Sequence, residues 1–102
     1  MPVKFKIAGN DLVFSIQEEI TINNANELRD EIISQFQANS DKRIVLDLKE
    51  TWFVDSAGMG ILYNLRKKIV DQKGKICLKS INPEVRKILE LTKLIDFFEI
   101  IS

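Results

Sequence analysis

The fold of this chain is decided by one central stretch, Phe53-Val54-Asp55-Ser56-Ala57-Gly58-Met59-Gly60. It follows a continuous apolar run, Ile44-Val45-Leu46, which is typical of a strand that is covered on both faces. From Gly58 onward, apolar or small residues recur at the spacing of one helix face. They are Gly58, Ile61, Leu62, Leu65 and Ile69. We therefore expect a strand-to-helix junction and a helix over residues 57–71 that ends at Gly74.

Ser56 is the predicted N-cap of that helix, because a serine oxygen accepts hydrogen bonds from first-turn N–H groups. Added negative charge there is favoured by the helix dipole. A serine at such a junction is most often only a cap, so a structural and a functional role both stay open. On the predicted outer face of the helix lie Ser56, Met59, Gly60, Tyr63 and Lys67. This face is a candidate docking surface, since Gly60 there serves no packing purpose, whereas Gly58 lets the helix approach the sheet.

Strands alternate with helices along the rest of the chain. Residues 3–7 and 12–16 alternate in polarity around the turn Gly9-Asn10, which predicts a hairpin. Asn23 or Asn24 starts a predicted helix, Asn82-Pro83-Glu84 starts another, and residues 94–101 predict a packed turn and a last strand. The hairpin is antiparallel while helical crossovers favour parallel pairing. We expect an α/β fold over residues 1–102, one domain with a mixed sheet of four to five strands and about three packed helices.

Composition argues against catalysis and against several classes of partner. Lys plus Arg and Asp plus Glu number 15 each, so no net field draws the chain to nucleic acid or to an anionic membrane. No apolar run is long enough to span a bilayer and no signal peptide is evident, which predicts a cytoplasmic protein. The chain has no histidine, and its one cysteine, Cys77, is expected in the core. We expect no cofactor, no metal and no enzymatic activity.

One enzymatic alternative comes from the same stretch. Residues 54–58 differ by one position from the G-x-S-x-G nucleophile elbow, but Val54 replaces the first glycine and no histidine is present to act as base. A small serine hydrolase is therefore a minor alternative. The Gly58-Met59-Gly60 segment is too short a motif to predict a phosphate site.

Several segments together carry a family resemblance. They are the hairpin, the first helix, Ile44-Val45-Leu46-Asp47-Leu48, Asp55-Ser56-Ala57-Gly58-Met59-Gly60, and Ser80-Ile81-Asn82-Pro83. Over almost its entire length the chain resembles a STAS domain, and it is most similar to the bacterial anti-sigma factor antagonists. The family signature is Asp-Ser-Ser-Gly followed by an apolar residue and Gly, and its first serine, the phosphorylation site, corresponds to Ser56.

The resemblance implies a partner switch. The unphosphorylated domain binds an anti-sigma factor serine kinase and so frees a sigma factor, phosphorylation at Ser56 ends that binding, and a serine phosphatase restores it. From the motif together with the predicted outer face of the helix, we expect the partner-binding residues to be Asp55, Ser56, Ala57, Gly58, Met59, Gly60 and Tyr63, extended by Trp52 and Thr21.

Two departures from the family pattern bear on the site. Ala57 stands where many members have a second serine, which leaves Ser56 as the only hydroxyl in the motif. Thr21 stands where several members have an aspartate, so the role of that carboxylate is not transferred. The alternative is a non-switching STAS module, a structural or transport-associated subunit in which Ser56 is only a cap.

Overall fold

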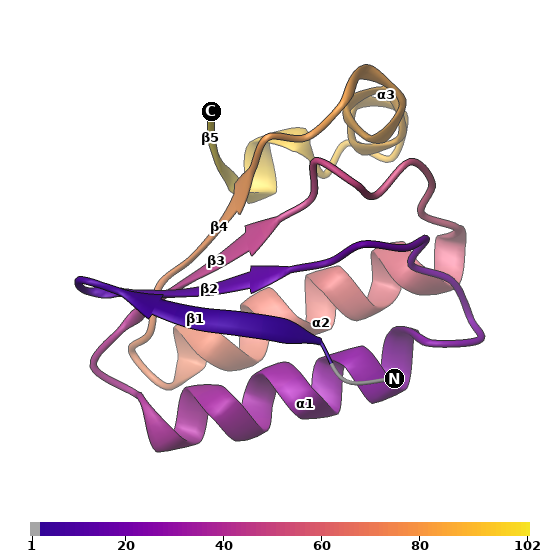
Figure 1. Ribbon diagram of the computed structural model, residues 1–102. Helices are drawn as coiled ribbons and strands as arrows, with labels where there is room; N and C mark the ends of the chain where they lie inside the picture. Colours follow the sequence, from indigo (N-terminus) through magenta and orange to yellow (C-terminus); the bar gives the residue numbers. More distant parts are fainter. Residues whose placement is uncertain (1–2) are drawn as a thin grey trace.

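The computed structural model describes residues 3–102, which form a five-stranded sheet in the order β1-β2-β3-β4-β5 (Figure 1). The strands are β1 (Lys4–Ala8), β2 (Asp11–Ser15), β3 (Arg43–Asp47), β4 (Ile76–Lys79) and β5 (Glu99–Ile101). β1 pairs with β2 in antiparallel fashion, and the remaining neighbours pair in parallel. The hairpin turn needs a positive φ of 62° at Gly9, which glycine adopts without steric cost. The predicted mixed α/β sheet with an N-terminal hairpin is confirmed.

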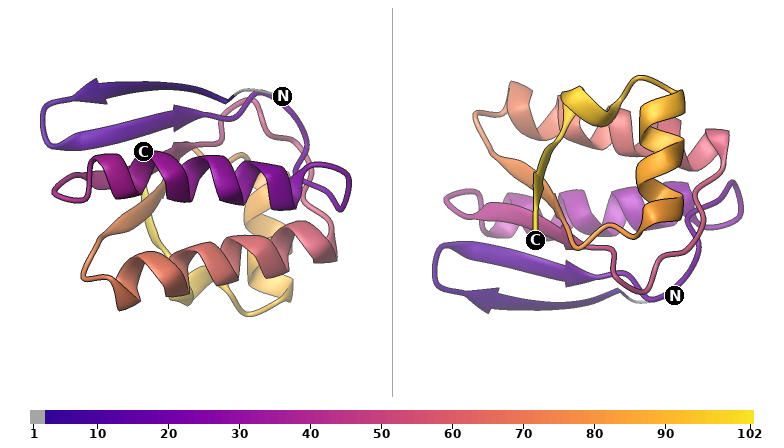
Figure 2. Two further views of the ribbon diagram at one scale, coloured as in Figure 1. Left: turned by 90° about the horizontal axis from the view of Figure 1, so that it is seen from below. Right: turned by 90° about the horizontal axis from the view of Figure 1, so that it is seen from above.

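Three helices pack with this sheet, as predicted: α1 (Ala25–Ala38), α2 (Ser56–Asp71) and α3 (Pro83–Leu91). A short 3-10 helix, η1 (Ile95–Phe97), precedes β5. α1 and α2 lie side by side below the sheet in Figure 1, whereas α3 lies above it, and Figure 2 shows the same arrangement from below and from above. α1 connects β2 to β3, α2 connects β3 to β4, and α3 connects β4 to β5, so each parallel pair of strands is joined through a helix.

The core lies between the sheet and the apolar faces of the helices. α1 contributes Ala25, Leu28, Ile32 and Phe36, and α2 contributes Gly58, Met59, Leu62, Leu65 and Ile69. They pack against buried strand residues such as Leu12, Phe14, Ile44 and Leu46. Full burial of each such large side chain contributes about 1.5–3 kcal/mol. Cys77 on β4 is buried as predicted, and this burial raises the pKa of its thiol.

The parallel strands place three loops at one edge of the sheet, on the right in Figure 1. These loops follow β2, β3 and β4. Thr51 in the second loop is buried, and its hydroxyl donates a hydrogen bond of 2.8 Å to the carbonyl oxygen of Ile16 in the first. Asn82 in the third loop donates from its side chain to the carbonyl oxygen of Thr51, and its Oδ1 accepts from the N–H of Val85 at 3.0 Å. Asn82 is thus the predicted cap of α3, and buried side chains hold the three loops together.

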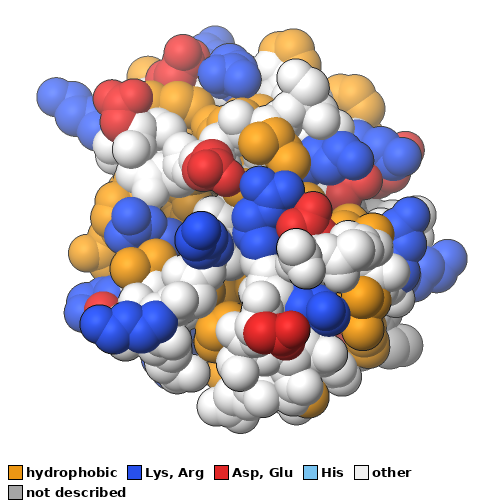
Figure 3. Space-filling view, turned by 90° about the vertical axis from the view of Figure 1, so that its left-hand side faces the viewer, with side chains coloured by type: hydrophobic (Ala, Val, Ile, Leu, Met, Phe, Trp, Pro, Cys, Tyr) orange, Lys and Arg blue, Asp and Glu red, His pale blue; other side chains and the backbone are white. Residues whose placement is uncertain are grey.

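The opposite edge of the sheet carries charges of both signs. Lys42, Arg43, Lys73 and Lys75 lie there with Asp11 and Asp41, and Figure 3 views this end of the molecule, where Lys and Arg side chains are interspersed with Asp and Glu. Arg43 donates two hydrogen bonds of 3.0 Å to the carboxylate of Asp11. This bidentate pair holds the pKa of the Asp11 carboxyl below its usual range.

Candidate functional site

Two loops meet just before α2, at the strand-to-helix junction. Ile20 and Val54 form an isolated parallel bridge beyond the ends of β2 and β3. The N–H of Ile20 donates to the carbonyl oxygen of Phe53 and the N–H of Asp55 donates to the carbonyl oxygen of Ile20, both at 3.1 Å. Both side chains of the bridge are buried. The loop after β2 is therefore fixed against the residues that lead into α2.

The N-cap of α2 is Asp55, so the prediction that Ser56 caps this helix is wrong. Asp55 has the extended backbone of a cap, and its Oδ1 accepts a hydrogen bond of 2.7 Å from the N–H of Gly58. Its Oδ2 accepts from the N–H of Ile22 at 3.1 Å. One carboxylate thus completes the first turn of the helix and also ties the loop after β2 to it. The carboxylate offers a separate oxygen to each of the two N–H groups, whereas a serine has a single oxygen on a shorter side chain.

Ser56 is the first residue of α2, and its side chain is exposed. Because Asp55 makes the cap, the Ser56 hydroxyl is left out of the capping hydrogen bonds. It lies at the positive end of the helix dipole, where added negative charge is favoured. Ala57 follows it as a half-buried residue. The Ser56 side chain is therefore open to solvent, and the cap does not depend on it.

The two glycines of the first turn have different surroundings, as predicted. A Cβ atom on Gly58 would overlap the carbonyl oxygen of Ile20 and would lie 2.9 Å from Cγ1 of Val54. A Cβ atom on Gly60 would meet nothing within 4 Å. Gly58 is therefore required by the close approach of α2 to the Ile20–Val54 bridge. Gly60 is exposed and has no packing role within the chain.

Met59 does not lie on the outer face of α2, and this part of the prediction is wrong. Only 4% of its surface is exposed, and it packs in the hydrophobic core with Leu62 and Val54. The buried face of a helix that packs against a sheet is broad, about 100° or more around the helix axis. Consecutive residues such as Gly58 and Met59 can therefore both be buried. Gly60 remains on the outer face.

Tyr63 also lies on the outer face, but it is partly engaged by the end of the chain. Its ring stacks on that of Phe97 in η1, with 4.7 Å between the ring centroids. The Arg66 guanidinium carbon lies 4.0 Å from the centroid of the same Phe97 ring. Tyr63 is therefore held in place by η1 while part of its ring is exposed.

Thr21 and Trp52 come from the two loops. Asn24 is the N-cap residue of α1, at the predicted start of this helix, but its side chain makes no capping hydrogen bond. Its Oδ1 instead accepts from the N–H of Thr21 at 2.9 Å and so orders this loop. Its Nδ2 donates to the Glu18 side chain and to the carbonyl oxygen of Glu19. Trp52 is 59% exposed. The structure therefore places both predicted residues at the same edge of the sheet as Ser56.

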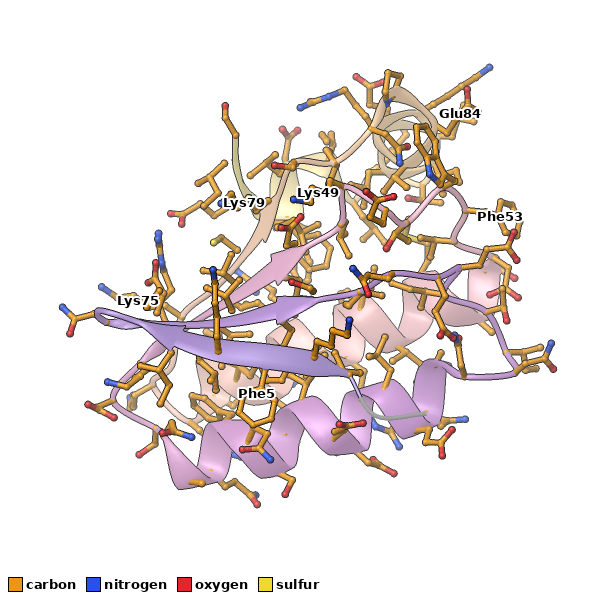
Figure 4. The ribbon with its side chains drawn as sticks, in the orientation of Figure 1. Phe5, Lys49, Phe53, Lys75, Lys79 and Glu84 are labelled. Atoms are coloured by element: carbon orange, nitrogen blue, oxygen red, sulfur yellow. The ribbon has the colours of Figure 1, made fainter. Side chains whose placement is uncertain are left out.

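Two large apolar side chains of this edge were missed in the sequence. Ile22 is 70% exposed and Phe53 is 45% exposed, and Figure 4 shows Phe53 at the end of the molecule that carries the three loops. A signal was present, since Phe53 alternates with the buried Val54 and Ile22 is an isolated apolar residue in a polar loop.

The site offers no metal-binding arrangement. Within residues 3–102, no three or more His, Cys, Asp or Glu side chains are grouped so that they could hold a metal ion. In the same residues no helix has both the length and the apolar content to cross a membrane.

Comparison with known proteins identifies relatives over nearly the whole chain. A family model described as the STAS domain matches residues 3–102. The chain is 28% identical to the anti-sigma-B factor antagonist of Bacillus subtilis (strain 168), over 96% of this chain and 88% of that protein. It is 30% identical to a STAS-domain containing protein of Pseudomonas aeruginosa (strain UCBPP-PA14), over 90% of this chain and 89% of that one. The crystal structure of an anti-sigma factor antagonist from Mycobacterium paratuberculosis matches with a TM-score of 0.82 and 25% identity, over 99% of this chain and 85% of that one.

Proposed function

This chain belongs to the STAS domain family, and from that membership we propose that it is an anti-sigma factor antagonist regulated by phosphorylation. Its unphosphorylated form binds an anti-sigma factor serine kinase, so that a sigma factor is freed. Phosphorylation of Ser56 by that kinase ends the association, and a serine phosphatase reverses the modification. The chain acts in the cytoplasm as a single binding domain and not as an enzyme.

The observation that carries this proposal is the division of roles between Asp55 and Ser56. Asp55 caps α2 and holds the loop after β2, while the Ser56 hydroxyl is exposed and outside the capping bonds. A kinase can therefore modify Ser56 without removing a structural hydrogen bond. The phosphate adds a charge of about −1.5 to −2 at neutral pH, which a closely packed partner surface must desolvate or repel.

The proposed partner surface surrounds Ser56 on the outer face of α2 and the two adjoining loops. It consists of Ser56, Gly60, Tyr63, Trp52 and Thr21, and it is supported from below by Asp55, Ala57 and Gly58. Met59 is excluded because it is buried in the core. The open space above Gly60 allows a partner backbone to approach the helix closely.

The phosphorylation site is tested by incubating the chain with each purified serine kinase of the anti-sigma type from the same organism, in the presence of ATP. Mass spectrometry should place one phosphate on Ser56. Ser56→Ala should still bind the kinase but should not be released on addition of ATP. Phosphate on Thr51 or Ser80 instead would contradict the proposal. No phosphate is expected on Thr51, because its hydroxyl is buried and hydrogen-bonded.

The partner surface is tested separately with Gly60→Glu. The new side chain points into open space, so the variant should melt close to the wild type while its affinity for the kinase falls by at least about tenfold, which is 1.4 kcal/mol. A wild type that binds such kinases but is never phosphorylated would instead favour the non-switching module.

A further inference from the structure

Three large apolar side chains are exposed on the two loops that meet before α2. Ile22 comes from the loop after β2, and Trp52 and Phe53 come from the loop after β3, with 70%, 59% and 45% of their surfaces exposed. We call these three residues the edge patch. Single exposed apolar residues are normal on a protein surface, but large ones gathered on adjoining loops are typical of an interaction site.

The backbone beneath the edge patch is fixed by hydrogen bonds. The N–H of Ile22 donates to Oδ2 of Asp55, and the carbonyl oxygen of Phe53 accepts from the N–H of Ile20, both at 3.1 Å. The buried hydroxyl of Thr51 holds the residue before Trp52 against the first loop. A partner that binds here therefore does not have to order the two loops, which lowers the entropic cost of association.

The edge patch lies among carboxylates. The two loops carry Glu18, Glu19, Glu50 and Asp55 but only one cation, Lys49. Lys42, Arg43, Lys73 and Lys75 lie at the opposite end of the molecule, and Figure 4 shows Lys75 and Phe53 at these two ends. The two loops that carry the edge patch therefore have a net negative charge, whereas the cations at the opposite end are accompanied by Asp11 and Asp41.

This negative end constrains the proposed kinase. Transfer of a phosphoryl group to Ser56 requires that the triphosphate of ATP comes next to it, and enzymes neutralise that charge with cationic side chains and metal ions. The carboxylates of Glu18, Glu19 and Glu50 on the two adjoining loops add to the negative charge of this edge. The partner must therefore supply further positive charge at this edge.

We propose that the edge patch is the apolar centre of the kinase-binding surface, and that the kinase covers it with an apolar pocket bordered by Lys or Arg side chains. The inference rests on the proposed function, since the occupant is the kinase that phosphorylates Ser56. It adds Ile22 and Phe53 to the partner surface as anchors. It also predicts that the kinase carries positive charge around the pocket that receives them. A few residues in the desolvated centre of a protein interface, with Trp, Tyr and Arg enriched among them, carry most of its binding free energy.

The apolar half of the proposal is tested by calorimetric titration with the kinase that phosphorylates Ser56, in the presence of ADP. Phe53→Ser and Ile22→Ser should each weaken binding by at least about tenfold, as expected of anchor residues. The matched control is Leu91→Ser on α3, because Leu91 is 74% exposed and lies outside the two loops. It should leave the affinity unchanged.

The electrostatic half is tested by Glu19→Lys, with Glu90→Lys on α3 as its control. The first variant should weaken binding by about tenfold at low ionic strength, and the loss should shrink in about 0.5 M salt because exposed charges are then screened. The control should have no such effect. Thermal melting of all variants, followed by circular dichroism, checks that they remain folded.

The outcomes separate the two proposals. If the wild type is phosphorylated at Ser56 but Phe53→Ser and Ile22→Ser bind the kinase as tightly as the wild type, the inference is overturned and the proposed function stands. If no such kinase binds the wild type, both are overturned. Sedimentation equilibrium tests a rival occupant, a second copy bound through the end that carries Lys75. Self-association abolished by both Phe53→Ser and Lys75→Glu would overturn the inference in favour of that copy.

Discussion

Substituting alanine at Gly58 and at Gly60 should change stability in opposite directions, although the two glycines lie in the same helical turn. Alanine is favoured over glycine within a helix by about 1 kcal/mol. At Gly60 the added methyl meets nothing within 4 Å, so this gain is realised and Gly60→Ala should stabilise the protein by about 0.5–1 kcal/mol.

At Gly58 the gain is outweighed by a clash with backbone. The added methyl overlaps the carbonyl oxygen of Ile20, which accepts the N–H of Asp55 at 3.1 Å, and it also lies 2.9 Å from Cγ1 of Val54. Backbone atoms cannot move aside as a flexible side chain does, so α2 must shift away from the bridge. Overpacking of this kind costs about 1–3 kcal/mol or more. Gly58→Ala should therefore destabilise the protein by about 1–3 kcal/mol.

Urea unfolding followed by circular dichroism measures both changes, with an unchanged m value as the check that the unfolded states are comparable. In thermal melts each kcal/mol corresponds to about 4–8 °C for a domain of this size. Gly60→Ala should melt about 2–8 °C above the wild type, and Gly58→Ala at least about 4 °C below it. A Gly58→Ala protein as stable as the wild type would refute the close approach of α2 to Ile20.

Three further predictions concern the polar groups that hold the fold. Asp55→Ala should cost about 1–2 kcal/mol by loss of the cap, and amide hydrogen exchange of Ile22 should become faster because its N–H loses the carboxylate acceptor. Asn82→Asp should keep the acceptor for the Val85 N–H but set a carboxylate oxygen against the Thr51 carbonyl oxygen in a buried position, so chemical denaturation should show it to be less stable than the wild type. The pKa of Asp11 is lowered by Arg43, so the stability that this pair adds is present above pH ~4 and is lost as the pH falls through the lowered pKa. Asp11→Asn should therefore be less stable than the wild type at pH 7, and the difference should disappear in acid titrations of stability.

The sequence predicted most of the fold because its signals were local. Alternation around Gly9 predicted the hairpin, the run Ile44-Val45-Leu46 predicted the central strand, and Asn82-Pro83 predicted the start of α3. Each of these patterns is set by residues a few positions apart, so that tertiary contacts reinforce the local preference instead of opposing it.

The errors at the site involve contacts that span long stretches of chain. Aspartate and serine both cap helices, and Asp55 was selected here partly because its second oxygen accepts the N–H of Ile22, 33 residues away. The burial of Met59 depends on how α2 sits under the Ile20–Val54 bridge. The stacking of Tyr63 on Phe97 joins α2 to the last segment of the chain. Helical spacing alone does not contain this information.

The separation of cap and hydroxyl determines where a phosphate on Ser56 would act. The helix dipole favours added negative charge by about 0.3–1 kcal/mol per unit charge, and the neighbouring Asp55 carboxylate opposes it. These two effects have opposite signs, and the hydrogen bonds of Asp55 to Gly58 and Ile22 do not involve the hydroxyl. A phosphate on Ser56 would therefore leave both hydrogen bonds of Asp55 in place. Under the proposed function its consequence falls on the partner that packs against Ser56, where a dianion would have to lose its water. A site built in this way lets a modification change binding while the stability of the domain stays the same.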